Sequence, residues 1–122
     1  DNNNVFLMGH SQGGITTATF KPADETMSVN ARIIEGWTCH AGWSEYRGIN
    51  APDNEPVLAI VASNDPWFQN HWTRGSCSTF IKKENGSRSI VLSEGELNAS
   101  HELLEDQNLQ KIVIDFMHTH MR

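Results

Sequence analysis

The stretch Val5–Gly14, with the sequence VFLMGHSQGG, decides how this chain is interpreted. Its first four residues are apolar and predict the end of a buried β-strand. The next five residues form a Gly-x-Ser-x-Gly pattern centred on Ser11, in which the flanking small residues favour an abrupt turn from a strand into a helix. Such a turn strains the serine backbone and lifts the hydroxyl above the end of the sheet. A glycine-rich turn without chemistry is the alternative.

This segment resembles the nucleophile region of the α/β-hydrolase superfamily, and its GHSQGG form is similar to the dienelactone-hydrolase-like branch. The resemblance implies that Ser11 is a nucleophile and that the backbone N–H of Gln12 contributes to an oxyanion hole. It also implies a chain order in which an acid follows a later strand and a histidine follows the acid.

The remaining chain predicts alternating strands and helices, and therefore the α/β class with a parallel sheet. The clearest strand, Val57–Ala62, is apolar throughout, which is typical of a parallel strand covered on both faces. We expect one domain over residues 1–122, and the resemblance implies the carboxy-terminal part of an α/β-hydrolase sheet flanked by helices. The other predicted elements are a helix over Gln12–Phe20, strands over Ala31–Ile34 and Ser87–Leu92, and a last helix with an apolar stripe at Leu109, Ile112, Val113, Phe116 and Met117.

An acid and a histidine occur in the order that the resemblance requires. Asp65 comes just after Val57–Ala62, and His101 comes after the last predicted strand. Since the carboxyl ends of parallel strands meet at one edge of a sheet, we expect Ser11, Asp65 and His101 to lie together. Two alternatives stay open: Asp65 as part of the turn before Pro66, and His101 as an ordinary loop residue.

These three residue types suit one kind of chemistry. Serine is a weak nucleophile that needs a base, histidine can take the proton and return it, and a carboxylate orients the imidazole. The prediction is a serine hydrolase that cleaves a small-molecule carboxylic ester, lactones included, through an acyl-enzyme, without metal or cofactor. The dienelactone branch often has a cysteine nucleophile, so Ser11 favours a general esterase. The alternative is a non-catalytic hydrolase-like fragment that acts as a structural or interaction module.

Aromatic residues follow Asp65 closely and suggest a substrate pocket. Trp67, Phe68 and Trp72 can line an apolar acyl or alcohol site, and His10, next to the serine, can contact substrate. Packing against the core edge, or beside the nucleophile, is the alternative for each of them.

Composition excludes some classes of partner and leaves others open. The chain has 122 residues and a formal net charge of −6, which argues against a nucleic-acid partner. No run of 18 apolar residues predicts a membrane span, so we expect a soluble protein. Cys39 and Cys77 are either a disulfide, which favours a secreted or periplasmic protein, or two buried thiols. A metal site built from these cysteines and His40 lacks a recognised ligand spacing.

Length sets a further expectation. An α/β-hydrolase is usually considerably longer, and its nucleophile strand lies near the middle of the sheet, whereas here the Ser11 motif comes almost first. We expect this chain to be the carboxy-terminal half, with Asp1–Asn4 as the loop into the first strand. The missing half is then a candidate partner that supplies the second oxyanion N–H, and the chain alone is expected to be weak or inactive.

Overall fold

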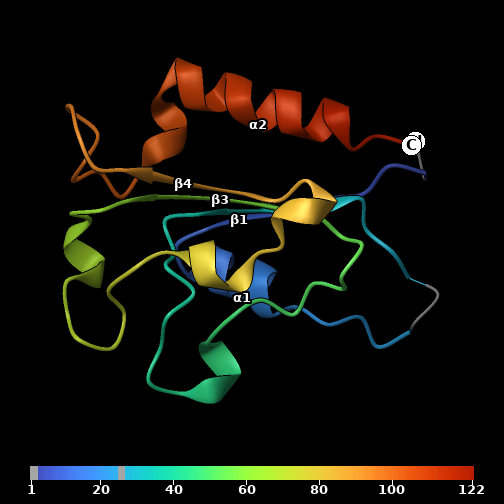
Figure 1. Ribbon diagram of the computed structural model, residues 1–122, viewed down its shortest axis with the longest axis horizontal. Coiled ribbons are helices and arrows are strands. Elements are labelled where there is room, and N and C mark those ends of the chain that lie inside the picture. The colour runs from blue at the N-terminus through green and yellow to red at the C-terminus, as the bar shows by residue number, and fades with distance from the viewer. Residues whose placement is uncertain (1–2, 25–26) are drawn as a thin grey trace.

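One four-stranded parallel sheet carries the fold in the computed structural model, which describes residues 3–24 and 27–122 (Figure 1). The first two residues of the predicted leading loop, Asp1 and Asn2, lie outside the described residues. The strands lie in the sheet in chain order and all pair in parallel. They are β1 (Phe6–His10), β2 (Ala31–Glu35), β3 (Val57–Ala62) and β4 (Arg88–Leu92), and the α-helices are α1 (Gln12–Thr19) and α2 (Gln107–Thr119).

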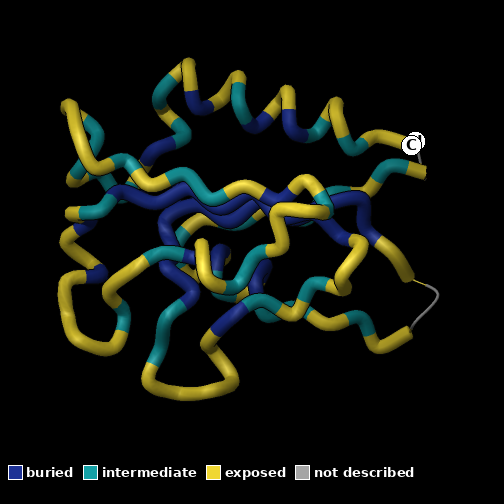
Figure 2. Tube along the Cα trace, in the orientation of Figure 1, coloured by how far each residue is buried: buried dark blue, intermediate teal, exposed yellow. Residues whose placement is uncertain are grey.

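The sheet separates two apolar cores. Helix α2 covers one face, while α1 and the long loops cover the other (Figure 1). Alternate side chains of β3 enter opposite cores: Leu58 and Ile60 pack with α2, and Ala59 and Val61 pack with the α1 side. Because both faces are covered, β2 and β3 are buried throughout, and they form the dark band in Figure 2. This explains the unbroken apolar pattern of the strand Val57–Ala62.

The predicted α/β class and parallel sheet are confirmed, with small shifts in the element bounds. Strand β3 has the predicted bounds, α1 ends one residue before Phe20, and β4 begins one residue after Ser87. The stripe on the last helix also faces the core, and its buried members are Leu109, Val113 and Phe116. Helix α2 starts where the Asp106 carboxylate accepts a hydrogen bond from the backbone N–H of Leu109 at 3.0 Å.

A buried ion pair within this fold was not expected from the sequence. Arg32 lies in β2, fully buried, and pairs with Glu55 in the loop before β3. The Arg32 guanidinium also donates hydrogen bonds to the backbone carbonyls of Thr17 at 2.9 Å and Phe20 at 2.7 Å, at the end of α1. Burial raises the pKa of the Glu55 carboxyl, and the neighbouring Arg32 opposes this rise. The pair therefore holds the far end of α1 against the sheet.

The connections after β2 and β3 are long loops with short 3₁₀ turns. These turns are η1 (Ser44–Tyr46), η2 (Pro66–Phe68), η3 (Cys77–Phe80) and η4 (Lys83–Asn85), and η5 (Leu103–Glu105) precedes α2. Cys39 and Cys77 form a disulfide between the two loops, so the alternatives of free thiols and of a metal site on these sulfurs are wrong. Among the described residues, no helix is long and apolar enough to cross a membrane.

Candidate active site

Ser11 occupies the turn between β1 and α1 with a strained backbone. Its φ is 58° and its ψ is −115°, in a region that residues with a side chain rarely adopt. The backbone N–H of Ser11 donates to the carbonyl of Glu35 on the neighbouring strand at 3.0 Å, which ties the turn to β2. The Ser11 side chain does not cap α1. Its hydroxyl is therefore free for the contact described next.

His101 joins Ser11 to Asp65 through two hydrogen bonds. Nδ1 of His101 lies 2.6 Å from Oδ2 of Asp65, and Nε2 lies 2.8 Å from Oγ of Ser11. The other Asp65 oxygen accepts the backbone N–H of Trp67 at 3.0 Å, so Asp65 also starts the turn η2. Asp65 is completely buried, whereas the His101 side chain keeps 15% of its surface exposed. The structure thus brings the three residues together at the carboxyl edge of the sheet.

The glycines around Ser11 differ in how much space the fold leaves for a side chain. A Cβ on Gly9 would lie 2.0 Å from the carbonyl oxygen of Gly13, and a Cβ on Gly14 would lie 3.2 Å from the Glu35 carbonyl oxygen. A Cβ on Gly13 would have nothing within 4 Å. The interpretation that small side chains are needed on both sides of Ser11 is therefore right for Gly9 and wrong for Gly13. The chain passes closely at Gly14 because α1 packs there against β2.

Gln12 follows Ser11 as the first residue of α1. The N–H groups in the first turn of an α-helix have no acceptor within the helix, and the helix dipole makes this end favourable for negative charge. Gln12 and Ser11 line the same hollow, so the backbone N–H of Gln12 is a candidate oxyanion donor.

In the part of the chain that the structure describes, the rings of His10, Trp67 and Phe68 lie around the His101 ring. The ring centroid of His10 lies 4.9 Å away, and those of Trp67 and Phe68 each lie 5.6 Å away. Together with Ser11 and Gln12, these three residues line a hollow of about 430 Å³. Phe68 is buried against the core as well, whereas Trp67 is 69% exposed. Trp72, the fourth predicted substrate residue, does not line this hollow but the cavity beside it.

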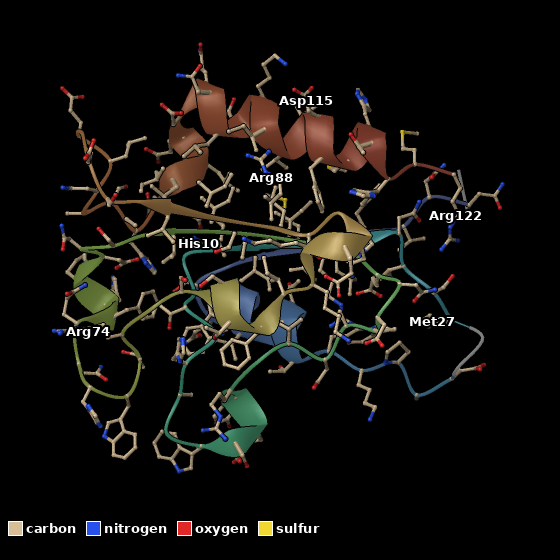
Figure 3. The ribbon with its side chains drawn as sticks, in the orientation of Figure 1. His10, Met27, Arg74, Arg88, Asp115 and Arg122 are labelled. Atoms are coloured by element: carbon tan, nitrogen blue, oxygen red, sulfur yellow. A yellow bond between two sulfur atoms is a disulfide. The ribbon has the colours of Figure 1, made fainter. Side chains whose placement is uncertain are left out.

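Sequence reasoning missed Glu35, which ends β2 and is buried. One of its carboxylate oxygens pairs with Nδ1 of His10, and the other accepts the backbone N–H of Leu103 at 2.7 Å, two residues after His101. The parallel register of β1 and β2 sets His10 opposite Glu35, and no local sequence pattern specifies that register. Glu35 therefore ties His10 to the loop that carries His101. In Figure 3, His10 lies on the same side of the molecule as Arg74, and Met27 and Arg122 lie on the other side.

No family model, curated protein or solved structure matches this chain. The residues and geometry of the site itself are therefore the basis for assigning a function.

Proposed function

We propose that this protein is a serine hydrolase that cleaves carboxylic esters, with Ser11 as nucleophile, His101 as general base and acid, and Asp65 as the orienting carboxylate. The observation that carries the proposal is the pair of hydrogen bonds from His101, at 2.8 Å to the Ser11 hydroxyl and at 2.6 Å to Asp65. A serine in a strained strand-to-helix turn, at a helix N-terminus, supports the same conclusion.

In the proposed reaction, Oγ of Ser11 attacks the ester carbonyl carbon while its proton moves to Nε2 of His101. The carbonyl oxygen becomes an oxyanion, which the N–H of Gln12 stabilises by hydrogen bonding. The tetrahedral intermediate then expels the alcohol, which takes the proton from Nε2 and leaves an acyl group on Ser11. Water then attacks the acyl carbon while His101 takes its proton, and His101 returns that proton to Oγ of Ser11 as the carboxylic acid leaves. Asp65 keeps the imidazole oriented and stabilises its charged form.

We propose further that the sheet is the carboxy-terminal part of an α/β-hydrolase domain. The support is the order Ser11, Asp65, His101 and the position of each residue beyond the carboxyl end of a strand. Strand β1 lies at the edge of the sheet. Further strands of such a domain, and the second oxyanion N–H, would be placed on that side, so a second polypeptide segment is a candidate partner there.

The direct test is labelling with a fluorophosphonate, which forms a covalent bond with activated serines. We expect one label per folded chain, and peptide mass spectrometry should locate it on Ser11. Chain unfolded in denaturant serves as the control and should not react, because the serine is then separated from His101. A label on another serine, or equal labelling of folded and unfolded chain, would contradict the proposal.

We expect Glu35 to act as a positioning residue. Replacing Glu35 with Ala removes the acceptor of the buried Leu103 N–H, which loosens the loop that carries His101. A small displacement of a catalytic base can lower the rate about 100-fold, so we expect kcat to fall by about 10- to 100-fold with little change in KM.

The variant Glu35→Gln is the matched control, because its amide oxygen can still accept from Leu103. Its kcat should recover most of the loss. If Glu35→Gln and Glu35→Ala are equally slow, or if KM rather than kcat changes, the positioning role is wrong.

The second candidate function is that of an interaction module that binds another chain by strand pairing. One observation favours it: β1 is an edge strand, and Met8 within it is 49% exposed. This function needs no reactive serine. Absence of specific Ser11 labelling, together with capture of a partner strand, would favour it over hydrolysis.

A further inference from the structure

A second, larger cavity lies beside the Ser11 hollow. Its volume is about 660 Å³, within the range of small-molecule sites. Ile15 and Trp37 line both spaces, so the two are adjacent. The other lining residues come from the loops after β2 and β3, which descend from the carboxyl edge of the sheet in Figure 1. They are Ala41, Gly42, Trp43, Tyr46, Asn70, Trp72 and Thr73.

Among residues 3–24 and 27–122, those that line this cavity are largely aromatic or apolar, and none of them carries a charged side chain. Trp43, Tyr46 and Trp72 are 69%, 48% and 64% exposed, although exposing a large aromatic side chain to water costs free energy. All four tryptophans of the chain line this cavity or the Ser11 hollow. Trp37 belongs to the core on the α1 side, whereas the indole rings of the other three, Trp43, Trp67 and Trp72, are mostly exposed around the two spaces next to Ser11.

The cavity walls are held in place before any ligand binds. The Cys39–Cys77 disulfide joins the two loops, and Nε2 of His40 lies 3.0 Å from the Ser76 carbonyl oxygen. The indole of Trp72 packs over Gly42, where a Cβ would lie 3.4 Å from the ring. A site with fixed walls loses less entropy on binding than a mobile one.

We propose that this cavity binds an uncharged aromatic arm of the ester that Ser11 attacks. This inference rests on the proposed function and deepens it by naming the substrate class: esters with an aromatic group on one side of the carbonyl. The shared wall of Ile15 and Trp37 lets one molecule place its carbonyl at Ser11 and its ring among the tryptophans. Indole and phenol faces suit a flat ring through edge and offset contacts, and a lining whose described residues are all uncharged disfavours ionic substrates.

The first measurement is the rate at which three neutral esters are hydrolysed, determined by pH-stat titration of the acid that is released. Ethyl acetate has no aromatic arm, benzyl acetate has one on the alcohol side, and ethyl phenylacetate has one on the acyl side. We expect Trp72→Ala and Trp43→Ala to lower kcat/KM for at least one aromatic ester by about 10- to 100-fold, mainly through KM. Hydrolysis of ethyl acetate should stay within about twofold.

The matched control is Ile114→Ala, which truncates another half-exposed apolar side chain on α2, outside both linings. This variant should hydrolyse all three esters with the kcat/KM of the native chain. An equal loss for ethyl acetate and the aromatic esters in the tryptophan variants would overturn the inference, and so would unchanged kinetics for both aromatic esters.

A binding measurement separates this inference from the proposed function. In Ser11→Ala, which cannot form an acyl-enzyme, benzyl acetate and ethyl phenylacetate are added while the four indole N–H signals are followed by NMR. Saturable shifts of the Trp43 and Trp72 signals, absent with ethyl acetate, support the cavity even if no ester is hydrolysed. Ester hydrolysis by the native chain without such shifts would leave the hydrolase proposal standing and overturn the aromatic site.

Discussion

Replacing Asp65 with Asn is expected to lower kcat/KM for any ester that the protein hydrolyses by about 10⁴-fold. In the native site, Nδ1–H of His101 donates to the Asp65 carboxylate at 2.6 Å, which leaves Nε2 free to accept the Ser11 proton. An asparagine amide can instead donate to Nδ1 and hold the opposite tautomer, whose Nε2–H cannot act as a base. The buried carboxylate that would stabilise the imidazolium is lost as well.

The fold should survive this change, because asparagine has the same shape and its oxygen can still accept the Trp67 N–H that starts η2. The control is Asp53→Asn. Asp53 is an exposed acid that pairs with Lys82 and lies before the amino end of β3, far from the carboxyl ends of the strands where Asp65 lies. The kcat/KM of this variant should stay within about twofold. If Asp65→Asn hydrolyses esters within tenfold of the native rate, with unchanged circular dichroism, Asp65 is not the orienting acid.

Replacing Gly9 with Ala is expected to have the largest effect on stability, a loss of more than about 4 kcal/mol in the free energy of unfolding. The added methyl carbon would lie 2.0 Å from the Gly13 carbonyl oxygen and 2.5 Å from Oγ1 of Thr17. Backbone atoms at this distance cannot rotate away, so β1 and α1 would have to separate. Thermal unfolding followed by circular dichroism measures the loss.

The control at the other glycine of the motif should behave in the opposite way. Gly13 lies within α1, and its Cβ would meet no atom within 4 Å. Alanine restricts the unfolded chain and favours the helix, so Gly13→Ala should stabilise the fold by about 0.5 to 1 kcal/mol. Equal losses in the two variants would mean that the close approach of β1 and α1 does not explain the motif.

The parts of the fold that the sequence predicts well are those governed by local patterns. A continuous apolar run predicts a strand that is buried on both faces, as found for Val57–Ala62. An apolar stripe predicts a helix that is buried along one side, as found for the helix with Leu109 and Val113. The bounds shift by a residue where local patterns compete. Strand β2 includes Glu35, because pairing with β1 and β3 continues past the apolar residues.

Arg32 shows where local patterns fail. A charged residue inside a short apolar run gives no sign of its own burial, and its partners Glu55, Thr17 and Phe20 come from segments on either side in the sequence. The pairing depends on where α1 ends over the sheet, which is a matter of tertiary packing.

By itself, the sequence determined the α/β class, the turn at Ser11 and the succession of Ser11, Asp65 and His101 along the chain, because strand, turn and helix patterns depend on short-range sterics and periodicity. Only the tertiary structure decided which side chains meet. The contact of Glu35 with Leu103, the Cys39–Cys77 disulfide and the aromatic cavity all join residues from separate loops or strands. Their distances depend on sheet register and on the paths of long loops, which no local pattern specifies.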